Sequence, residues 1–82
     1  MFVVYVIQSQ IDSRLYKGFT NDITNRLKEH NSGKTKSTNA FLPWVLVYSE
    51  KVSSRIEARE REKYLKSGIG RDYLNRILKK AP

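Results

Sequence analysis

Two side chains that can bind an anion or move a proton, Arg26 and His30, lie four residues apart in this sequence. Side chains at positions i and i+4 of a helix lie one above the other on the same face. A guanidinium is permanently cationic and an imidazole changes its charge near neutral pH, so the pair is suited to phosphate binding or proton transfer. Either chemistry requires a partner from another part of the chain.

Two tyrosines are candidate partners because they lie in two segments that favour strands. Tyr5 belongs to an apolar run that begins at Phe2, and Tyr16 belongs to the run that begins at Leu15. If the two strands pair antiparallel, the two phenol rings can lie near one another on a shared face of the sheet. The simpler interpretation is packing, in which each ring fills the core and its hydroxyl finds a hydrogen-bond partner.

Glu62 is the candidate carboxylate. It lies four residues after Ala58 and three before Leu65, so a helix places it in line with the inward face. One interpretation is an ion pair with Arg59 or Lys66 on a solvated flank. The sharper interpretation is a metal ligand, because Mg²⁺ is often held by one or two carboxylates together with water and substrate phosphate.

The segments that position these residues predict the element order β-β-α-β-α-α. The expected strands cover residues 2–7, 15–20 and 44–48, and the expected helices cover residues 22–30, 54–67 and 70–78. Asn21 or Asp22 is suited to cap the first helix, and Gly33 is suited to a left-handed residue after its end. Ser54 followed three residues later by Glu57 forms a capping box for the second helix.

Composition limits the class of protein. The 82 residues predict a single domain, 1–82, and 16 Lys and Arg against 8 Asp and Glu give a net charge of +8. This charge favours a polyanionic partner such as nucleic acid, with an acidic membrane surface as the competing partner. No apolar run reaches about 18 residues, so a membrane-spanning helix is not expected. The absence of cysteine and of a signal-peptide pattern is consistent with a cytoplasmic protein.

A polar segment after the first predicted helix carries two further basic residues, Lys34 and Lys36. They alternate with hydroxyl side chains and follow Gly33. Such a segment can contact DNA phosphates, although a solvated loop has the same composition. The basic residues Lys79 and Lys80 end the chain and are expected to fray.

Several short motifs occur in an order and spacing that resemble the GIY-YIG endonuclease family, in particular its small single-domain bacterial members. The matching segments are Val3-Val4-Tyr5, Tyr16-Lys17-Gly18, Asn25-Arg26-Leu27 with His30, Ala58 through Glu62, Pro43-Trp44, and Lys63-Tyr64-Leu65-Lys66-Ser67-Gly68. Each three-letter pattern recurs by chance, so the resemblance rests on the whole series.

The resemblance implies an α+β fold, in which a three-stranded antiparallel sheet is flanked by helices, and cleavage of DNA with one divalent metal. The metal is expected to be Mg²⁺, with Mn²⁺ as the alternative. Glu62 is expected to hold it, Arg26 to stabilise the phosphate, and Tyr5 and Tyr16 to position or activate the attacking water. His30 is expected to relay a proton or contact phosphate, with a structural hydrogen bond as its simpler role.

The sequence departs from the family pattern in its first two motifs. Val3 and Val4 replace a glycine and an isoleucine, which is a mild change because an apolar strand need only present Tyr5. Lys17 replaces the middle isoleucine of the second motif. Its stem can extend along apolar surface while its ammonium group reaches water, so Lys17 is expected at the surface and is a further candidate for phosphate contact.

The leading hypothesis is a metal-dependent DNA endonuclease that recognises DNA structure in repair or recombination, alone or directed by a protein partner. A chain this short has little room for a separate reader of base sequence. The alternatives are a non-catalytic nucleic-acid-binding module, and a basic ribosome-associated or interaction protein. An inward carboxylate that repels phosphate favours the enzyme, because a pure binding protein has no chemical use for it. The sequence does not predict the oligomeric state.

Overall fold

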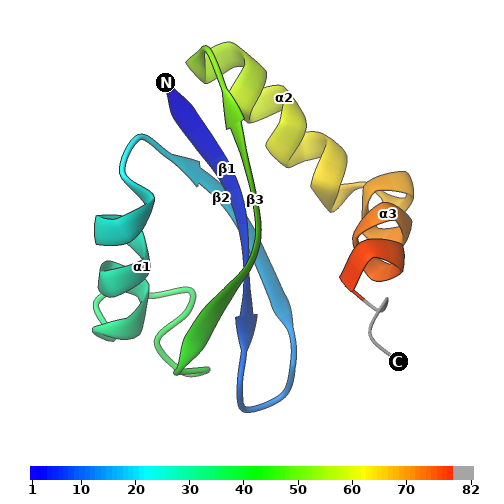
Figure 1. Cartoon of the computed structure of the whole chain (residues 1–82). Coiled ribbons are helices and arrows are strands. Elements are labelled where there is room, and N and C mark those ends of the chain that lie inside the picture. The colour runs from blue at the N-terminus through cyan, green and yellow to red at the C-terminus, as the bar shows by residue number, and fades with distance from the viewer. Residues whose placement is uncertain (79–82) are drawn as a thin grey trace.

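A computed structural model describes residues 1–78 and shows three strands and three helices in the predicted order (Figure 1). The strands are β1 (Phe2–Ser9), β2 (Leu15–Thr20) and β3 (Trp44–Val52), and the helices are α1 (Ile23–Asn31), α2 (Arg55–Lys66) and α3 (Gly68–Leu78). The predicted α+β fold is therefore confirmed. Lys79 and Lys80, predicted to form a basic tail, lie outside the described residues.

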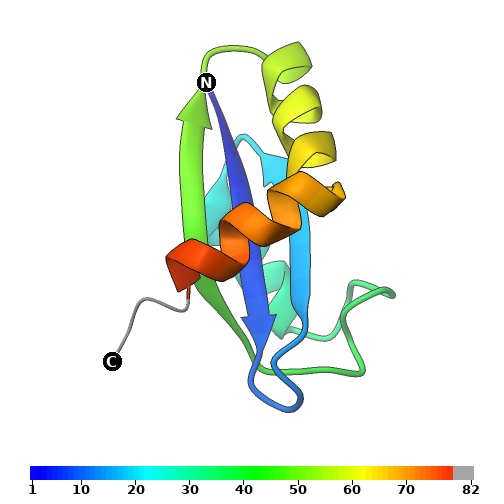
Figure 2. The same ribbon diagram turned by 90° about the vertical axis from the view of Figure 1, so that its right-hand side faces the viewer.

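The three strands form one antiparallel sheet in the order β2-β1-β3. Helix α1 covers one face of this sheet, and α2 and α3 cover the other (Figures 1 and 2). The central strand β1 is therefore enclosed on both faces, which explains its continuous run of buried side chains from Val4 through Ile7. Strands β2 and β3 are the two edges.

Each face of the sheet has its own hydrophobic cluster, because successive side chains of a strand point to opposite faces. Val4 and Val6 pack toward α2 and α3 with Ala58, Leu65 and Leu74. Tyr5 and Ile7 pack toward α1 with Trp44, and Tyr16, Ile23 and Leu27 border this second cluster. Alternation along β1 thus places Tyr5 on the face that α1 covers.

The helix ends follow the expected capping chemistry. Asp22 caps α1 by accepting a hydrogen bond from the Asn25 N–H at 3.1 Å. Ser54 caps α2 by accepting one from the Glu57 N–H at 3.1 Å. The Glu57 carboxylate, however, returns to the N–H of Ser53 at 3.2 Å, one residue before the predicted position. Capping therefore starts both helices within a residue of the predicted positions.

Strands β1 and β3 are longer than predicted, because polar residues at their ends still take part in the sheet. Gln8 lies opposite both Leu15 and Val45, and Val52 lies opposite Phe2. Helix α3 begins at Gly68 rather than Gly70. The apolar residues alone do not mark the ends of β1 and β3, since backbone pairing extends a strand past its apolar segment.

The loop between α1 and β3 is fastened at its two ends. Asn31 closes α1, and its side-chain carbonyl accepts a hydrogen bond from the Trp44 N–H at 2.6 Å while its amide donates to the Trp44 carbonyl at 2.9 Å. Gly33 follows with a left-handed φ of 82°, as predicted. The loop is therefore held against the start of β3.

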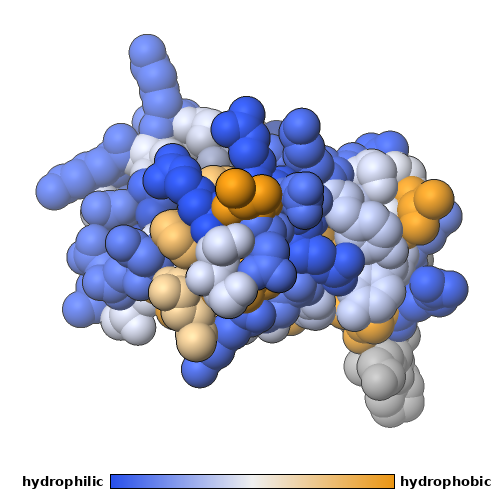
Figure 3. Space-filling view, turned by 90° about the horizontal axis from the view of Figure 1, so that it is seen from above, coloured by the Kyte–Doolittle hydropathy of each residue, from blue (hydrophilic) through white to orange (hydrophobic). Residues whose placement is uncertain are grey.

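The surface at the end of the molecule where β1 and α2 begin is mostly hydrophilic, with small separate hydrophobic areas (Figure 3). Within residues 1–78, no helix has the length and apolar content needed to cross a membrane.

Candidate active site

A buried hydrogen-bonded row joins β1, α1 and the following loop. The Tyr5 hydroxyl lies 2.9 Å from Nε2 of His30, and Nδ1 of His30 lies 2.9 Å from Oγ1 of Thr38. Tyr5 is 1% exposed, and His30 and Thr38 are fully buried. Both ring nitrogens of His30 are therefore engaged inside the protein, and neither contacts solvent.

Tyr16 lies beside this row on the same face of the sheet. Its ring meets the His30 ring edge-on, with centroids 5.0 Å apart and an interplanar angle of 62°. On its other side it packs against Trp44 at 6.3 Å. The prediction that Tyr5 and Tyr16 share a face is confirmed, and His30 is packed against both rings.

Gly18 makes room for the Tyr5 ring. The two residues lie opposite one another in the β1–β2 ladder. A Cβ atom at position 18 would lie 2.7 Å from the Tyr5 hydroxyl oxygen and 2.9 Å from Cζ. Any larger residue would therefore displace the phenol. The glycine of the second motif thus has a steric function in the site.

Arg26 stands one helical turn before His30, as predicted. Its Nη1 lies 2.9 Å from Oε1 of Glu29, in an ion pair that is partly exposed. Hydrogen bonding to Glu29, and then to Tyr5, raises the pKa of Arg26, so the guanidinium stays cationic. The sequence analysis did not single out Glu29, although its i+3 spacing from Arg26 is a signal of such a pair.

Burial decides the protonation of the two central groups. It raises the pKa of Tyr5 above 10.0; hydrogen bonding and charge from Arg26 lower it, but not enough to reverse the shift. Burial and the charge of Arg26 hold the pKa of His30 below 6.5. At neutral pH Tyr5 is therefore a protonated phenol and His30 a neutral imidazole. The charge of Arg26 therefore does not by itself make Tyr5 a base.

Glu62 approaches from α2, which packs on the other face of the sheet against β1 and β2. Its charge acts on the Tyr5 hydroxyl and raises the pKa of Tyr5. Its side chain is 21% exposed, and its Oε2 lies 3.4 Å from Nζ of Lys66, one of the two partners expected from the sequence. The ion pair is long and partly solvated, so it contributes little to stability.

The donor set around Glu62 fits a hard cation that takes most of its ligands from water and substrate. A single carboxylate with solvent access is the kind of ligand that Mg²⁺ uses beside a phosphate. Among the described residues there is no group of three His, Cys, Asp or Glu side chains that could hold a metal ion by themselves. An all-protein metal cage is therefore not the arrangement here.

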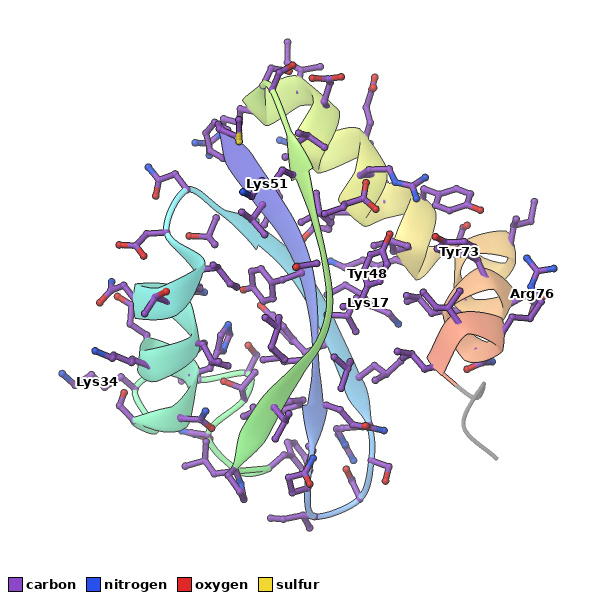
Figure 4. The ribbon with its side chains drawn as sticks, in the orientation of Figure 1. Lys17, Lys34, Tyr48, Lys51, Tyr73 and Arg76 are labelled. Carbon is purple, nitrogen blue, oxygen red and sulfur yellow. The ribbon has the colours of Figure 1, made fainter. Side chains whose placement is uncertain are left out.

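The three lysines expected to contact phosphate lie on two sides of the sheet. Lys34 and Lys36 are exposed on the loop that carries Thr38. Lys17 is half-buried and points toward α2 and α3, whereas Lys34 lies on the α1 side (Figure 4). Burial, and then the charges of Arg71 and Lys66, lower the pKa of Lys17. Lys17 is thus separated from the face that holds Tyr5 and Tyr16.

An apolar groove of about 370 Å³ also lies on the α1 side, where Ile23 and Leu27 face Leu46 of β3. None of the predicted catalytic side chains lines it. The groove is therefore separate from the buried row of Tyr5, His30 and Thr38, which is called the tyrosine–histidine row below.

The fold and the site together define a small α+β domain. The GIY-YIG catalytic domain matches residues 1–74. The chain belongs to the GIY-YIG family, as its motifs predicted. Its relatives are UPF0213 proteins, a small bacterial type of this family. The family implies a nuclease that binds DNA.

Three of these relatives illustrate the similarity. A UPF0213 protein of Bacillus licheniformis is 48% identical over 63 residues, which make up 76% of this chain but 64% of that protein, less than two thirds of its length. One from Staphylococcus haemolyticus is 42% identical over 65 residues, 78% of each chain. The solution NMR structure of UPF0213 protein BH0048 from Bacillus halodurans matches 100% of this chain and 89% of its own, with a TM-score of 0.57 and 34% identity.

Two residues of the site were missed by sequence reasoning. Thr38 was read only as part of a polar loop, because nothing in a run of lysines and hydroxyls marks which hydroxyl turns inward. Glu29, the ion-pair partner of Arg26, was not among the predicted site residues. Of the predicted catalytic residues, Tyr5, Tyr16, Arg26 and His30 come together on the α1 side of the sheet. Glu62 lies on α2, which covers the other face, and its carboxylate pairs with Lys66.

Proposed function

We propose that this protein is a metal-dependent endonuclease that hydrolyses DNA phosphodiester bonds, with nicked or branched DNA of repair or recombination as the expected substrate. The observation that carries the proposal is the buried hydrogen bond between Tyr5 and His30. The charges of Arg26 and Glu62 both influence the pKa of Tyr5, and Arg26 lies one helical turn before His30. A phenol with a proton acceptor, together with a cation and a carboxylate, are the groups that phosphodiester hydrolysis uses.

The charged groups have complementary tasks. Arg26 stabilises the negative charge that grows on the phosphoryl oxygens, because a cation placed there binds the transition state more strongly than the ground state. Glu29 holds the guanidinium in position through their 2.9 Å contact. Glu62 would hold Mg²⁺ or Mn²⁺, which supplies Lewis-acid stabilisation of the attacked phosphate and of the leaving oxygen when bound.

Tyr5 and His30 move the proton of the attacking water. As the water oxygen bonds to phosphorus and the bond from phosphorus to the leaving sugar oxygen breaks, a proton of the water passes to the Tyr5 oxygen while the phenol proton passes to Nε2 of His30. Tyr5 therefore remains neutral throughout, which its raised pKa favours. The leaving oxygen takes its proton from solvent. This relay is favoured over direct phosphate contact by His30, because the ring is fully buried and both nitrogens are engaged. Tyr16 packs against the imidazole and orients it.

A non-catalytic nucleic-acid-binding module is the second candidate, and one contact favours it. Lys66 already pairs with Glu62, so the carboxylate has a partner without any metal. This candidate expects salt-dependent DNA binding that is unaffected by divalent metal or by removal of the Glu62 side chain.

A cleavage panel separates the two candidates. Purified protein is incubated with branched, nicked and linear DNA in Mg²⁺, in Mn²⁺ or in chelator. We expect cleavage of at least one substrate only when metal is present, and a loss of about 100-fold or more in Glu62→Ala and Tyr5→Phe proteins. Glu60→Ala is the matched control, since Glu60 is an exposed glutamate of the same helix and is expected to leave the rate unchanged.

Two results would contradict the nuclease. One is the absence of cleavage with every substrate and both metals. The other is cleavage that persists at the normal rate in Glu62→Ala and Tyr5→Phe proteins. DNA binding by all variants with equal, salt-dependent affinity would then support the binding module.

A further inference from the structure

Thr38 is the unexplained member of the buried row. It lies in the loop between α1 and β3, yet its side chain is fully buried against His30. Threonine in an exposed polar loop is ordinarily solvated, so this position has a specific cause. Its hydroxyl oxygen is 2.9 Å from Nδ1 of His30, on the far side of the ring from Tyr5.

Hydrogen-bond accounting indicates which nitrogen of His30 carries the proton. A neutral imidazole has one N–H donor and one bare nitrogen acceptor. The Thr38 hydroxyl can donate to the Thr35 carbonyl at 3.4 Å, which leaves its lone pairs to accept from Nδ1–H. Nε2 is then bare and accepts from the Tyr5 hydroxyl, whose proton has no other acceptor among the described residues.

The opposite tautomer satisfies fewer groups. With the proton on Nε2, the ring would donate to the Tyr5 oxygen. The phenol proton would then lose the acceptor that Nε2 provides. The Thr38 hydroxyl would also have to turn from the Thr35 carbonyl toward Nδ1. Burial makes an unpaired polar group costly, so the accounting favours the proton on Nδ1.

The main chain of Thr38 is fixed independently of this hydroxyl. Its carbonyl accepts a hydrogen bond from Nε1 of Trp44 at 2.9 Å and another from the Phe41 N–H at 3.2 Å. Its own N–H donates to the Thr35 carbonyl at 3.1 Å. The loop therefore presents the Thr38 hydroxyl to His30 from a constrained position.

We propose that Thr38 is a positioning residue that holds neutral His30 in the tautomer protonated on Nδ1, so that Nε2 is free to take the proton of Tyr5. The proposal rests on the proposed nuclease function for its purpose, but the tautomer itself can be measured without any cleavage. The proposal gives the loop between α1 and β3 a role in the site, and the sequence motifs assign no role to Thr38.

The direct test is ¹⁵N NMR of the full-length protein at neutral pH. The chain has one histidine, so the two ring-nitrogen resonances belong to His30 without ambiguity. We expect the shift of a protonated nitrogen at Nδ1 and of a bare nitrogen at Nε2 in the unaltered protein. Bare Nδ1 and protonated Nε2 would overturn the proposal, whether or not the protein cleaves DNA.

Variants add a second measurement. Thr38→Val keeps the shape but removes the acceptor, so the tautomer should shift toward protonated Nε2 and kcat should fall by about 10- to 100-fold with little change in KM for DNA. Thr38→Ser keeps a hydroxyl and should restore both the tautomer and most of kcat. Thr24→Val, an exposed threonine on α1, is the matched control for the substitution itself.

The outcomes separate the two levels of the proposal. A folded Thr38→Val protein with an unchanged tautomer and unchanged kcat overturns the role of Thr38. An unaltered protein that shows the expected tautomer but cleaves no DNA leaves the hydrogen-bond arrangement standing and contradicts the nuclease function. If Thr38→Val does not fold, the unaltered protein and Thr38→Ser still decide the tautomer.

Discussion

At the scale of single residues, burial is what gives the site its chemistry. Tyr5 and His30 are both buried, so both are held in their neutral forms. A neutral phenol is a poor base and a neutral imidazole is a poor acid, so neither group acts alone. The pair can, however, pass protons in one direction when a water molecule reacts. Arg26 supplies positive charge to this pair without ionising Tyr5.

The buried imidazole predicts a pH dependence of stability. Burial and Arg26 hold the pKa of His30 in the folded protein below the ordinary 6.5, so on acidification the unfolded chain binds a proton first. Stability should therefore fall as the pH falls from about 8 to about 5.5, with a slope of at most about 1.4 kcal/mol per pH unit. Urea unfolding at several pH values measures this.

A His30→Gln protein is the control for this dependence. Because the chain has one histidine, the slope in this window should flatten in that variant. A protein that becomes more stable between about pH 7 and about pH 5.5 would show that His30 is charged, not neutral, in the folded state.

At the scale of elements, the site depends on how closely β1 and β2 fit together. Tyr5 and Gly18 are cross-strand partners, and the phenol ring occupies the space that a side chain at position 18 would need. The register of the hairpin therefore positions the Tyr5 hydroxyl as directly as the helix positions His30. A shift of one residue would turn Tyr5 to the other face.

A methyl group at position 18 should disrupt this fit. In Gly18→Ala the new Cβ would lie 2.7 Å from the Tyr5 hydroxyl oxygen, so the ring must move and its bond to His30 is lost. We expect a loss of about 1–3 kcal/mol in the free energy of unfolding and about 100-fold in the cleavage rate. Denaturant unfolding and the cleavage assay measure the two effects.

Gly68→Ala provides the comparison for that experiment. A Cβ at position 68 meets no atom within 4 Å, so this variant should be as stable as the unaltered protein or slightly more stable. Equal behaviour of the two alanine variants would show that Gly18 does not determine the position of Tyr5.

At the scale of the whole molecule, basic residues lie on both sides of the sheet among the described residues. Lys34 and Lys36 lie on the loop beside α1, near the tyrosine–histidine row. Lys17 and Arg76 lie on the side of α2 and α3 (Figure 4). DNA that enters the proposed site must approach from the first side, so charges on that side should contribute most to binding.

Salt titration of DNA binding tests this difference. Replacing both Lys34 and Lys36 with alanine should weaken binding and reduce the slope of log K against log salt concentration by about 2, since each phosphate contact contributes about 0.9. Arg76→Ala removes an exposed charge on α3 and should change the slope by less than one contact. An equal loss per residue at both places would mean that DNA binding is not confined to the α1 side.

The sequence alone determined the elements and most of the candidate chemistry of this protein. Local signals were sufficient for this, because Asp22 and Ser54 cap helices through their own neighbours and apolar runs mark β1 and β2. Helical spacing placed Arg26 beside His30, and strand alternation allowed Tyr5 and Tyr16 to share a face. The motif series then indicated the family, which the comparisons confirmed.

Only the tertiary structure decided what surrounds these residues. The burial of His30 between Tyr5 and Thr38 depends on a loop whose path is set by Asn31 and Trp44, and no local signal encodes that path. Strand alternation turns Lys17 away from the face of Tyr16, and the packing of α2 and α3 on that side leaves it half-buried. Contacts between residues far apart in sequence create these environments, so proton affinity and accessibility at the site emerge only when the chain is folded.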